Sequence, residues 1–251
     1  MTEIRTITAG RGASWFIEGL ASFQKNAGAW IGIGFLLFIM GLVTMTFPFS
    51  GLLLQLLTPV LIGGLLIGCR DSMNGGRLGL NHLFAGFSNS TGNLVLLGIL
   101  YTIASCVIMA LMFGMAIIAV GGSVIFSTII EGNPVTILDN LLILMLVILA
   151  GSLLYLPLLM AFWFGPALII FEGHNPLTAM KYSFFGCVKN SLAFLVYGLV
   201  GIVLAIIATI PFMLGWIVLL PLTIIGFYLS YRDIYAQYAG RLLDQDVSHV
   251  S

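Results

Sequence analysis

Long stretches without a charged side chain constrain this chain more than any other feature of its sequence. No charged residue occurs over the 44 positions from Asn26 to Cys69, and uncharged runs of 53, 32 and 42 residues follow. A membrane-spanning helix needs about 20 apolar residues, because about 30 Å of hydrocarbon is crossed at about 1.5 Å per residue. The first and last runs therefore hold two spans each, and the two between them hold one each.

Composition excludes the other broad classes of protein. Hydrophobic residues make up 60% of the 251 positions and charged residues only 7%, whereas soluble domains carry about 25% charged residues. Nine Lys and Arg residues balance nine Asp and Glu residues, so the basic excess typical of nucleic-acid binding is lacking. The runs are continuously apolar, which excludes the alternating strands of a membrane β-barrel. The three cysteines are far apart and show no disulfide or metal-ligand spacing.

The predicted fold is an all-α, polytopic transmembrane bundle of six spans in three hairpins, forming one integral membrane domain over residues 1–251. Residues 1–28 are a cytoplasmic amphipathic segment, residues 29–231 hold the spans, and residues 232–251 are a cytoplasmic tail. Breaks are expected where proline and glycine gather: at Phe47–Gly51, Gly121–Gly122, Gly132–Pro134 and Pro211. The predicted spans are Ala29–Phe47, Leu52–Cys69, Leu94–Ile117, Leu141–Ile170, Leu192–Ile210 and Leu214–Tyr231.

The stretch Ala119–Ile130 has two interpretations. It is either a re-entrant piece or an outer-surface segment, and its Gly and Ser residues favour the outer surface.

The positions of Lys and Arg predict the orientation. All nine fall before the first span, in the second and fourth connections, or in the tail, which is one side of a six-span plan. The opposite side keeps only Glu131 and Asp139. The positive-inside rule then places both termini in the cytoplasm.

A short amphipathic segment precedes each hairpin. Apolar residues recur at helical spacing from Trp15 to Phe23, from Leu80 to Phe87, and from Leu177 to Cys187, where Asn175 is the expected N-cap and Pro176 the first helical residue. We expect these segments to be interfacial helices with their aromatic faces toward lipid. The alternative is that each simply extends the next span.

Two spans resemble each other closely enough to suggest a parallel repeat of three hairpins. In each, a proline (Pro59, Pro221) precedes an Arg-Asp pair by 11 residues. Some transporters are built from parallel repeats. Leucine-rich spans with a proline are common, however, so convergence also explains the likeness.

The charged residues at the span ends are the first group of candidate site residues. The simpler interpretation is that they anchor the topology, and the sharper one is that they contact lipid headgroups or a partner protein. They are Arg70, Asp71, Lys181, Lys189, Arg232 and Asp233.

Four prolines form the second group: Pro59, Pro157, Pro166 and Pro221. Each leaves a backbone carbonyl without its helical donor, so these positions mark either a lined cavity or plain kinks. Glycines inside spans are interpreted as helix-packing positions: Gly32, Gly34, Gly63, Gly64, Gly68, Gly198 and Gly201. Gln55 and Thr58 are expected to make a helix–helix hydrogen bond.

No catalytic constellation, metal-ligand set or cofactor motif is recognisable, and no predicted span carries an ionisable residue in its middle. We therefore expect no cofactor and no enzymatic activity.

Several short stretches together resemble an uncharacterised group of bacterial inner-membrane proteins. They are Trp163–Leu168, Asn175–Leu177, Ala179–Met180, Ser183–Phe184, Cys187–Asn190, Trp15–Phe23 and Leu57–Pro59. The chain is also distantly similar to the membrane domain found beside some glycerophosphodiester phosphodiesterases. The resemblance implies a six-span inner-membrane protein and no catalytic role, because the soluble phosphodiesterase domain is not present.

Three function classes follow from the sequence. The favoured one is a non-enzymatic accessory or scaffold protein that packs with lipid, a partner membrane protein or further copies of itself. The alternative is a permease or lipid-handling transporter with a pathway between the hairpins at Pro59, Pro157 and Pro221. An interfacial enzyme is least favoured, since it needs Asp71, Glu172, His174 and Asp233 to converge.

Overall fold

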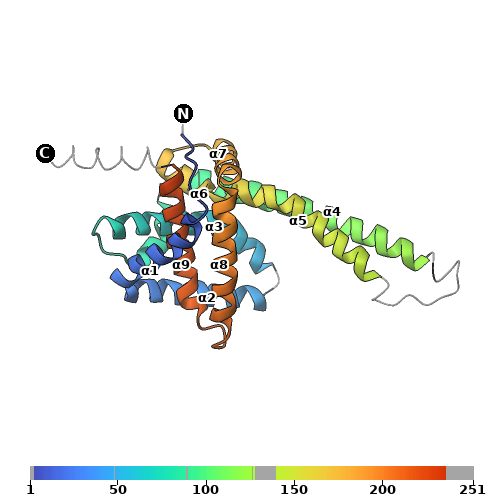
Figure 1. The fold of residues 1–251 in the computed structure, drawn as a ribbon, viewed down its shortest axis with the longest axis horizontal. Helices are drawn as coiled ribbons and strands as arrows, with labels where there is room; N and C mark the ends of the chain where they lie inside the picture. The colour runs from blue at the N-terminus through green and yellow to red at the C-terminus, as the bar shows by residue number, and fades with distance from the viewer. Residues whose placement is uncertain (1–2, 48, 89, 126, 128–139, 236–251) are drawn as a thin grey trace.

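A computed structural model describes residues 3–47, 49–88, 90–125, 127 and 140–235, and every regular element in these ranges is helical. Six helices there are long and apolar enough to cross a membrane, and they form three consecutive hairpins (Figure 1). The hairpins are α2 (Ala27–Thr46) with α3 (Ser50–Met73), α4 (Thr91–Ile125) with α5 (Leu141–Trp163), and α8 (Ser191–Thr209) with α9 (Trp216–Ile234). The chain is therefore a polytopic helical membrane protein.

A short helix precedes each hairpin, as predicted: α1 (Arg11–Lys25), η1 (Leu80–Phe87) and α7 (Pro176–Lys189). Asn175 caps α7, because its side-chain oxygen accepts a hydrogen bond from the Thr178 N–H at 2.9 Å. The middle segment is a 3₁₀ helix and not an α-helix.

The aromatic face of α1 packs on protein, whereas we expected it to face lipid. Trp15, Phe16 and Phe23 are buried, and the Phe16 ring stacks on Tyr197 of α8 at a centroid distance of 4.6 Å. Leu20, expected on the same face, is exposed. Helix α1 is therefore a structural part of the α8–α9 hairpin.

Four predicted spans agree with the observed helices to within about four residues. The break predicted at Gly121–Gly122 is wrong, because α4 continues through both glycines to Ile125. The predicted fourth span is also divided: α5 ends at Trp163, and α6 (Gly165–Glu172) follows it.

Pro166 explains this division. The Pro166 nitrogen carries no hydrogen, so it cannot donate to the Phe162 carbonyl. The proline ring also disfavours helical backbone angles at the preceding residue. The buried Ser183 hydroxyl of α7 enters the resulting gap, accepting from the Phe164 N–H at 2.8 Å and donating to the Met160 carbonyl at 2.6 Å. These two backbone groups would be bonded directly in an unbroken helix, so Ser183 restores both partners.

Part of what the sequence predicts lies outside the described residues. This applies to Glu131, Asp139, the Gly132–Pro134 break, most of Ala119–Ile130 and residues 236–251.

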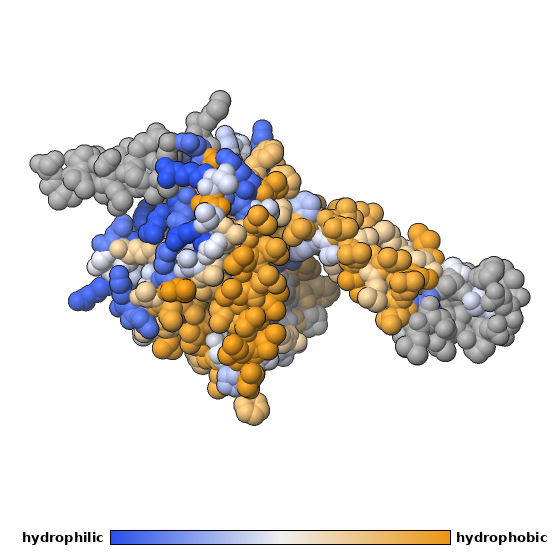
Figure 2. All heavy atoms as spheres, in the orientation of Figure 1, coloured by the Kyte–Doolittle hydropathy of each residue, from blue (hydrophilic) through white to orange (hydrophobic). Residues whose placement is uncertain are grey.

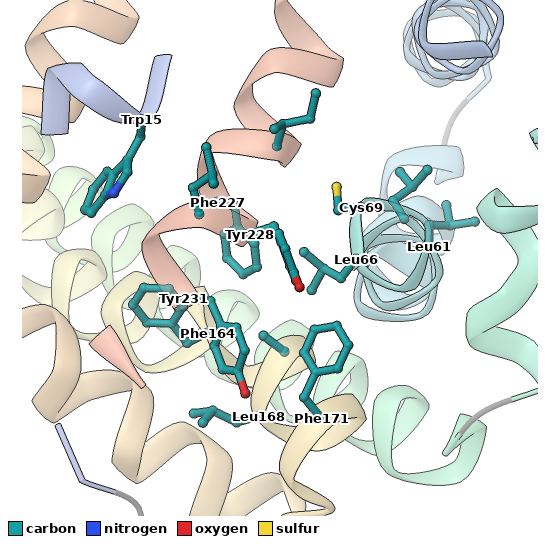
Figure 3. Close-up of a cluster of buried hydrophobic side chains, with 14 of the residues drawn as sticks. Trp15, Leu61, Leu66, Cys69, Phe164, Leu168, Phe171, Phe227, Tyr228 and Tyr231 are labelled. Atoms are coloured by element: carbon teal, nitrogen blue, oxygen red, sulfur yellow. The ribbon is translucent and has the colours of Figure 1, made fainter. Parts of the chain in front are cut away.

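The core joins α3, α6 and α9, whose large side chains face one another (Figure 3). The Phe171 ring contacts Tyr228 and Tyr231 at centroid distances of 5.9 and 5.4 Å. Leu66 and Cys69 of α3 are buried beside them (Figure 3). This packing holds the proline-containing helices of three different hairpins together.

Two junctions support the repeat. Helices α1 and α7 each end at a Lys-Asn pair, and Asn26 and Asn190 then lead into a span with similar backbone angles, φ −134° and ψ 40° against φ −117° and ψ 26°. Both asparagine side chains bond to distant segments: Asn26 to Ser72 at 2.8 Å, and Asn190 to the backbone of Ile7 and Arg5.

The α4–α5 hairpin projects away from the other four spans (Figure 1). Its surface is almost entirely apolar, while hydrophilic residues gather around the ends of α7 and α9 (Figure 2). We call that region, with Arg70, Lys189 and Arg232, the polar end.

Candidate functional site

The three hairpins surround an open cleft of about 570 Å³. Its walls come from α2, α3, α4, α5, α8 and α9, so all six spanning helices contribute. This volume lies within the range of about 300–1,000 Å³ that ligand sites occupy.

The four sequence-predicted prolines do not line this cleft themselves, but each lies close in sequence to residues that do. Residues within four positions of each one line it: Gln55 and Thr58 near Pro59, Tyr155 near Pro157, Trp163 near Pro166, and Thr223 near Pro221. The cavity interpretation of these prolines therefore has a geometric basis. Pro59, Pro157 and Pro221 also remain inside continuous helices.

The polar groups on the cleft are neutral and come from separate helices. The Tyr101 and Tyr155 hydroxyls, from α4 and α5, bond to each other at 2.5 Å. Thr58 donates to the Leu54 carbonyl of its own helix, and the Gln55 carboxamide makes no hydrogen bond within the described protein. The expected helix–helix bond from Gln55 and Thr58 is therefore wrong, and both residues line the cleft instead.

An apolar groove of about 530 Å³ adjoins the cleft. It runs between α5, α8 and α9 and reaches Phe16 of α1 and Cys187 of α7 at the polar end. Trp163, Tyr197 and Thr223 line both hollows. The cleft and the groove are thus separate chambers that meet at these side chains.

The packing interpretation is wrong for Gly198 and Gly201, which instead leave open space in the groove. A Cβ placed on Gly198 would meet nothing within 4 Å, and one on Gly201 would meet only the Phe16 ring at 3.6 Å. The packing interpretation holds for Gly34 and Gly64, where a Cβ would lie 1.9 and 2.5 Å from the Ile217 and His82 carbonyl oxygens.

A shallow depression of about 650 Å³ continues the cleft in the other direction. It lies where α2 ends and α3 begins, and it shares Thr44, Gly51 and Gln55 with the cleft. The three hollows therefore form a series from the α2–α3 turn to the polar end.

Arg70 and Asp71 pair with each other, Nε to Oδ1, at 3.3 Å. Asp71 also lies 3.5 Å from His82 Nε2, and the Arg70 guanidinium lies 5.6 Å from the centre of the Phe171 ring. These contacts join α3 to η1 and α6 and are consistent with the anchor interpretation.

Arg232 and Asp233 do not repeat this pairing. Asp233 Oδ2 accepts hydrogen bonds from Arg11 at 2.6 and 2.9 Å and from Trp15 Nε1 at 2.9 Å, which ties α1 to the end of α9. Glu18 also bonds to Arg11, at 2.6 Å, and these bonds raise the pKa of the Arg11 guanidinium above its ordinary value. The network is structural and leaves Asp233 engaged.

The remaining sequence-predicted cations lie at the polar end. Lys181 is exposed, Lys189 donates to the Ile4 carbonyl at 2.5 Å, and Arg232 is partly buried near Tyr228. Their role as headgroup or partner contacts stays a prediction.

The groups that an interfacial enzyme needs do not share one site. The side chain of Glu172 is fully buried and contacts His174 at 3.1 Å and Tyr231 at 3.3 Å, whereas Asp71 and Asp233 have the other partners described above. Within the described ranges, no three His, Cys, Asp or Glu residues are grouped as a metal site.

Sequence reasoning missed the tyrosine pair, Ser183 and Asn190. Tyr101 and Tyr155 are 54 residues apart, and nothing in the spacing indicates that they meet. The Lys-Asn pairs that precede two spans were a signal for Asn190, because they recur at equivalent places.

One relative identifies the kind of protein. A protein of Burkholderia thailandensis described as a probable inner membrane protein is 28% identical over 256 residues, which cover 95% of this chain and 93% of that protein. No family model matches the chain, and no solved structure matches it. Together with the six apolar helices, this relative supports a multi-pass inner-membrane protein of unknown activity.

Proposed function

We propose that this inner-membrane protein binds and handles a lipid-like amphiphile in the cleft and groove between its hairpins. The single observation that carries the proposal is the junction of the two hollows, where a cleft with hydroxyl and amide groups adjoins an apolar groove. An amphiphile needs both surfaces, because its chain is best accommodated among apolar side chains and its polar end needs hydrogen bonds.

Of the function classes predicted from the sequence, this proposal favours the permease or lipid-handling transporter over the accessory role. A non-enzymatic mechanism is part of it, since binding and release along the hollows need no chemical step. Asp71, Glu172 and Asp233 bond to three different sets of partners, which supports a structural use of the carboxylates.

Lipid analysis of the purified full chain tests the proposal. The lipids that remain with the protein in mild detergent are compared between wild type, Gly198→Phe and Gly114→Phe. Phe at position 198 fills the groove, whereas a side chain on Gly114, also on a span, meets nothing within 4 Å and lies outside both hollows.

We expect wild type and Gly114→Phe to retain the same lipid in excess of its share in the membrane, and Gly198→Phe to lose it. Equal lipid content in all three proteins contradicts the proposal. Equal elution volumes on size exclusion establish that the variants fold alike.

Both termini are proposed to be cytoplasmic. Support comes from the positive-inside rule and from the gathering of hydrophilic residues at the polar end (Figure 2). Single cysteines at Arg77 and Lys181 should be shielded from a membrane-impermeant reagent added to intact spheroplasts. Cysteines at Phe49 and Phe212, which are 79% and 93% exposed at the opposite turns, should react. The reverse pattern overturns the orientation.

An accessory role is kept as a second candidate because the α4–α5 hairpin stands clear of the other spans (Figure 1). A photo-crosslinking residue at Phe113 or Leu153, both exposed on that hairpin, should then capture a partner membrane protein or a second copy. The same residue at Leu195 of α8 is the control. Adducts with lipid alone at all three positions exclude this role.

A further inference from the structure

The cleft carries no charge, which restricts the polar end of any ligand. None of the residues that line it is Asp, Glu, Lys, Arg or His. A phosphate placed there would be removed from water and would have no cation to pair with, which carries a large free-energy cost. The chemistry of the cleft therefore favours a neutral polar group.

The three threonines on the cleft are hydrogen-bond acceptors toward a ligand. The Thr44, Thr58 and Thr223 hydroxyls donate to carbonyls of their own helices, at 2.6, 2.7 and 2.7 Å. Their hydrogens are thus used, while each oxygen keeps a lone pair. A ligand that can donate is therefore favoured over one that only accepts.

Three further groups add donor capacity, and one of them is the buried Trp163 Nε1–H, which has no hydrogen-bond partner within the described residues. The tyrosine pair has two hydroxyl hydrogens, of which one bridges Tyr101 and Tyr155, so the other remains for a ligand. The unbonded Gln55 carboxamide offers two donors and one acceptor. A hydroxyl group, which donates and accepts at once, satisfies this mixed set.

The groove accounts for the rest of the ligand. Its lining is almost wholly apolar, and the absence of side chains at Gly198 and Gly201 leaves room for a chain beside α8. It borders the cleft at Trp163 and Tyr197, so a ligand that passes these two side chains would have its acyl chain in the groove and its polar end in the cleft.

We infer that the ligand is a neutral lipid whose polar end carries a hydroxyl group, of the diacylglycerol or long-chain alcohol class. The hydroxyl lies among Gln55, Thr58 and the tyrosine pair, and a chain lies in the groove. This inference rests on the proposed function and adds the headgroup class to it.

Three probes with identical chains separate the headgroup from the chain. Dioctanoylglycerol carries the hydroxyl, its 3-O-methyl ether only accepts, and dioctanoyl phosphatidic acid is anionic. Binding of each to the purified full chain in detergent is measured by equilibrium dialysis. We expect dioctanoylglycerol to bind about tenfold more tightly than the ether, which is the effect of about one hydrogen bond, and phosphatidic acid to bind more weakly still.

Variants locate the two ends of the ligand. Thr58→Val removes an oxygen that can only accept, so it should weaken dioctanoylglycerol several-fold and leave the ether nearly unchanged. Gln55→Leu removes two donors and one acceptor, so it should weaken both probes. Gly198→Phe should weaken all three probes, while Gly114→Phe should weaken none. Matching thermal unfolding midpoints and elution volumes show that the variants are folded.

The outcomes distinguish this inference from the proposed function. If Gly198→Phe weakens all three probes but phosphatidic acid binds as tightly as dioctanoylglycerol, the headgroup inference is wrong and the lipid-binding role stands. If no probe responds to Gly198→Phe, the lipid-binding role fails together with the inference.

Discussion

The Ser183 hydroxyl accepts a hydrogen bond from the Phe164 backbone N–H at 2.8 Å and thereby fixes α7 to the broken end of α5. The same oxygen donates to the Met160 carbonyl, so one side chain satisfies both groups that Pro166 separates. The bend between α5 and α6 thus depends on a residue from another helix.

Ser183→Ala should lower the thermal unfolding midpoint in detergent. The Met160 carbonyl loses its donor, and the Phe164 N–H keeps only its bond to the Phe162 carbonyl, which costs about 1–2 kcal/mol. Ser152→Ala is the matched control, because that exposed hydroxyl bonds only to the Leu149 carbonyl of its own helix. An equal effect of both changes contradicts the bridging role.

Gly34→Ala should separate α2 from α9. The new Cβ would lie 1.9 Å from the Ile217 carbonyl oxygen, and this is backbone that cannot move away cheaply. We expect a loss of about 1–3 kcal/mol, as in other overpacked sites, measured by chemical or thermal unfolding. Gly41→Ala on the same helix has free space and should be neutral or slightly stabilising.

Asp233→Asn should loosen α1 without unfolding the spans. The Arg11 guanidinium loses one of its two carboxylate partners, and the cost is only about 1 kcal/mol because both side chains are partly exposed. Hydrogen exchange of the α1 amides should become several-fold faster, while that of α8 stays the same. Arg77→Gln, at an exposed position, should leave the exchange rates of both α1 and α8 unchanged. If it accelerates α1 exchange as much as Asp233→Asn does, the acceleration comes from a general change of charge and not from the lost Arg11 contact.

Cys187 should resist maleimide in the folded protein. Burial disfavours the thiolate and raises the pKa of Cys187 to about 12, so roughly one thiol in 10⁴ is ionised at pH 8. In a C69S/C106S background, labelling should occur only after SDS is added. Lys181→Cys, exposed on the same helix, should label at once. Rapid labelling of native Cys187 would show that α7 is not packed on the bundle.

The spans could be predicted because each one needs about 20 apolar residues in sequence, and this signal is local. The end of α4 could not be predicted in this way. Glycines that break helices in water are tolerated in lipid, where the backbone has no hydrogen-bond partners outside the helix. Pro166 was one of four candidate helix breaks, and the sequence could not single it out because the group that stabilises the break, Ser183, is contributed by another helix.

The candidate site was predictable only in part. Proline positions indicate which carbonyls lose their donors, but not which helices lie side by side. One cleft brings together residues that neighbour Pro59, Pro157 and Pro221 in the sequence, which depends on the tertiary packing of the spans. The Tyr101–Tyr155 pair depends on the packing of α4 against α5. Residue spacing alone predicts neither the grouping of these residues around the cleft nor the tyrosine pair.

The length of α4 bears on how the α4–α5 hairpin tilts in the bilayer. At about 1.5 Å per residue its 35 residues extend about 52 Å, so lying wholly within about 30 Å of hydrocarbon requires a lean of about 50° or more. A thinner bilayer increases that lean, and a thicker one reduces it. Tyr101 and Tyr155 stand on this hairpin while Gln55 and Thr223 do not, so any change in the tilt of the hairpin would move one wall of the cleft relative to the other.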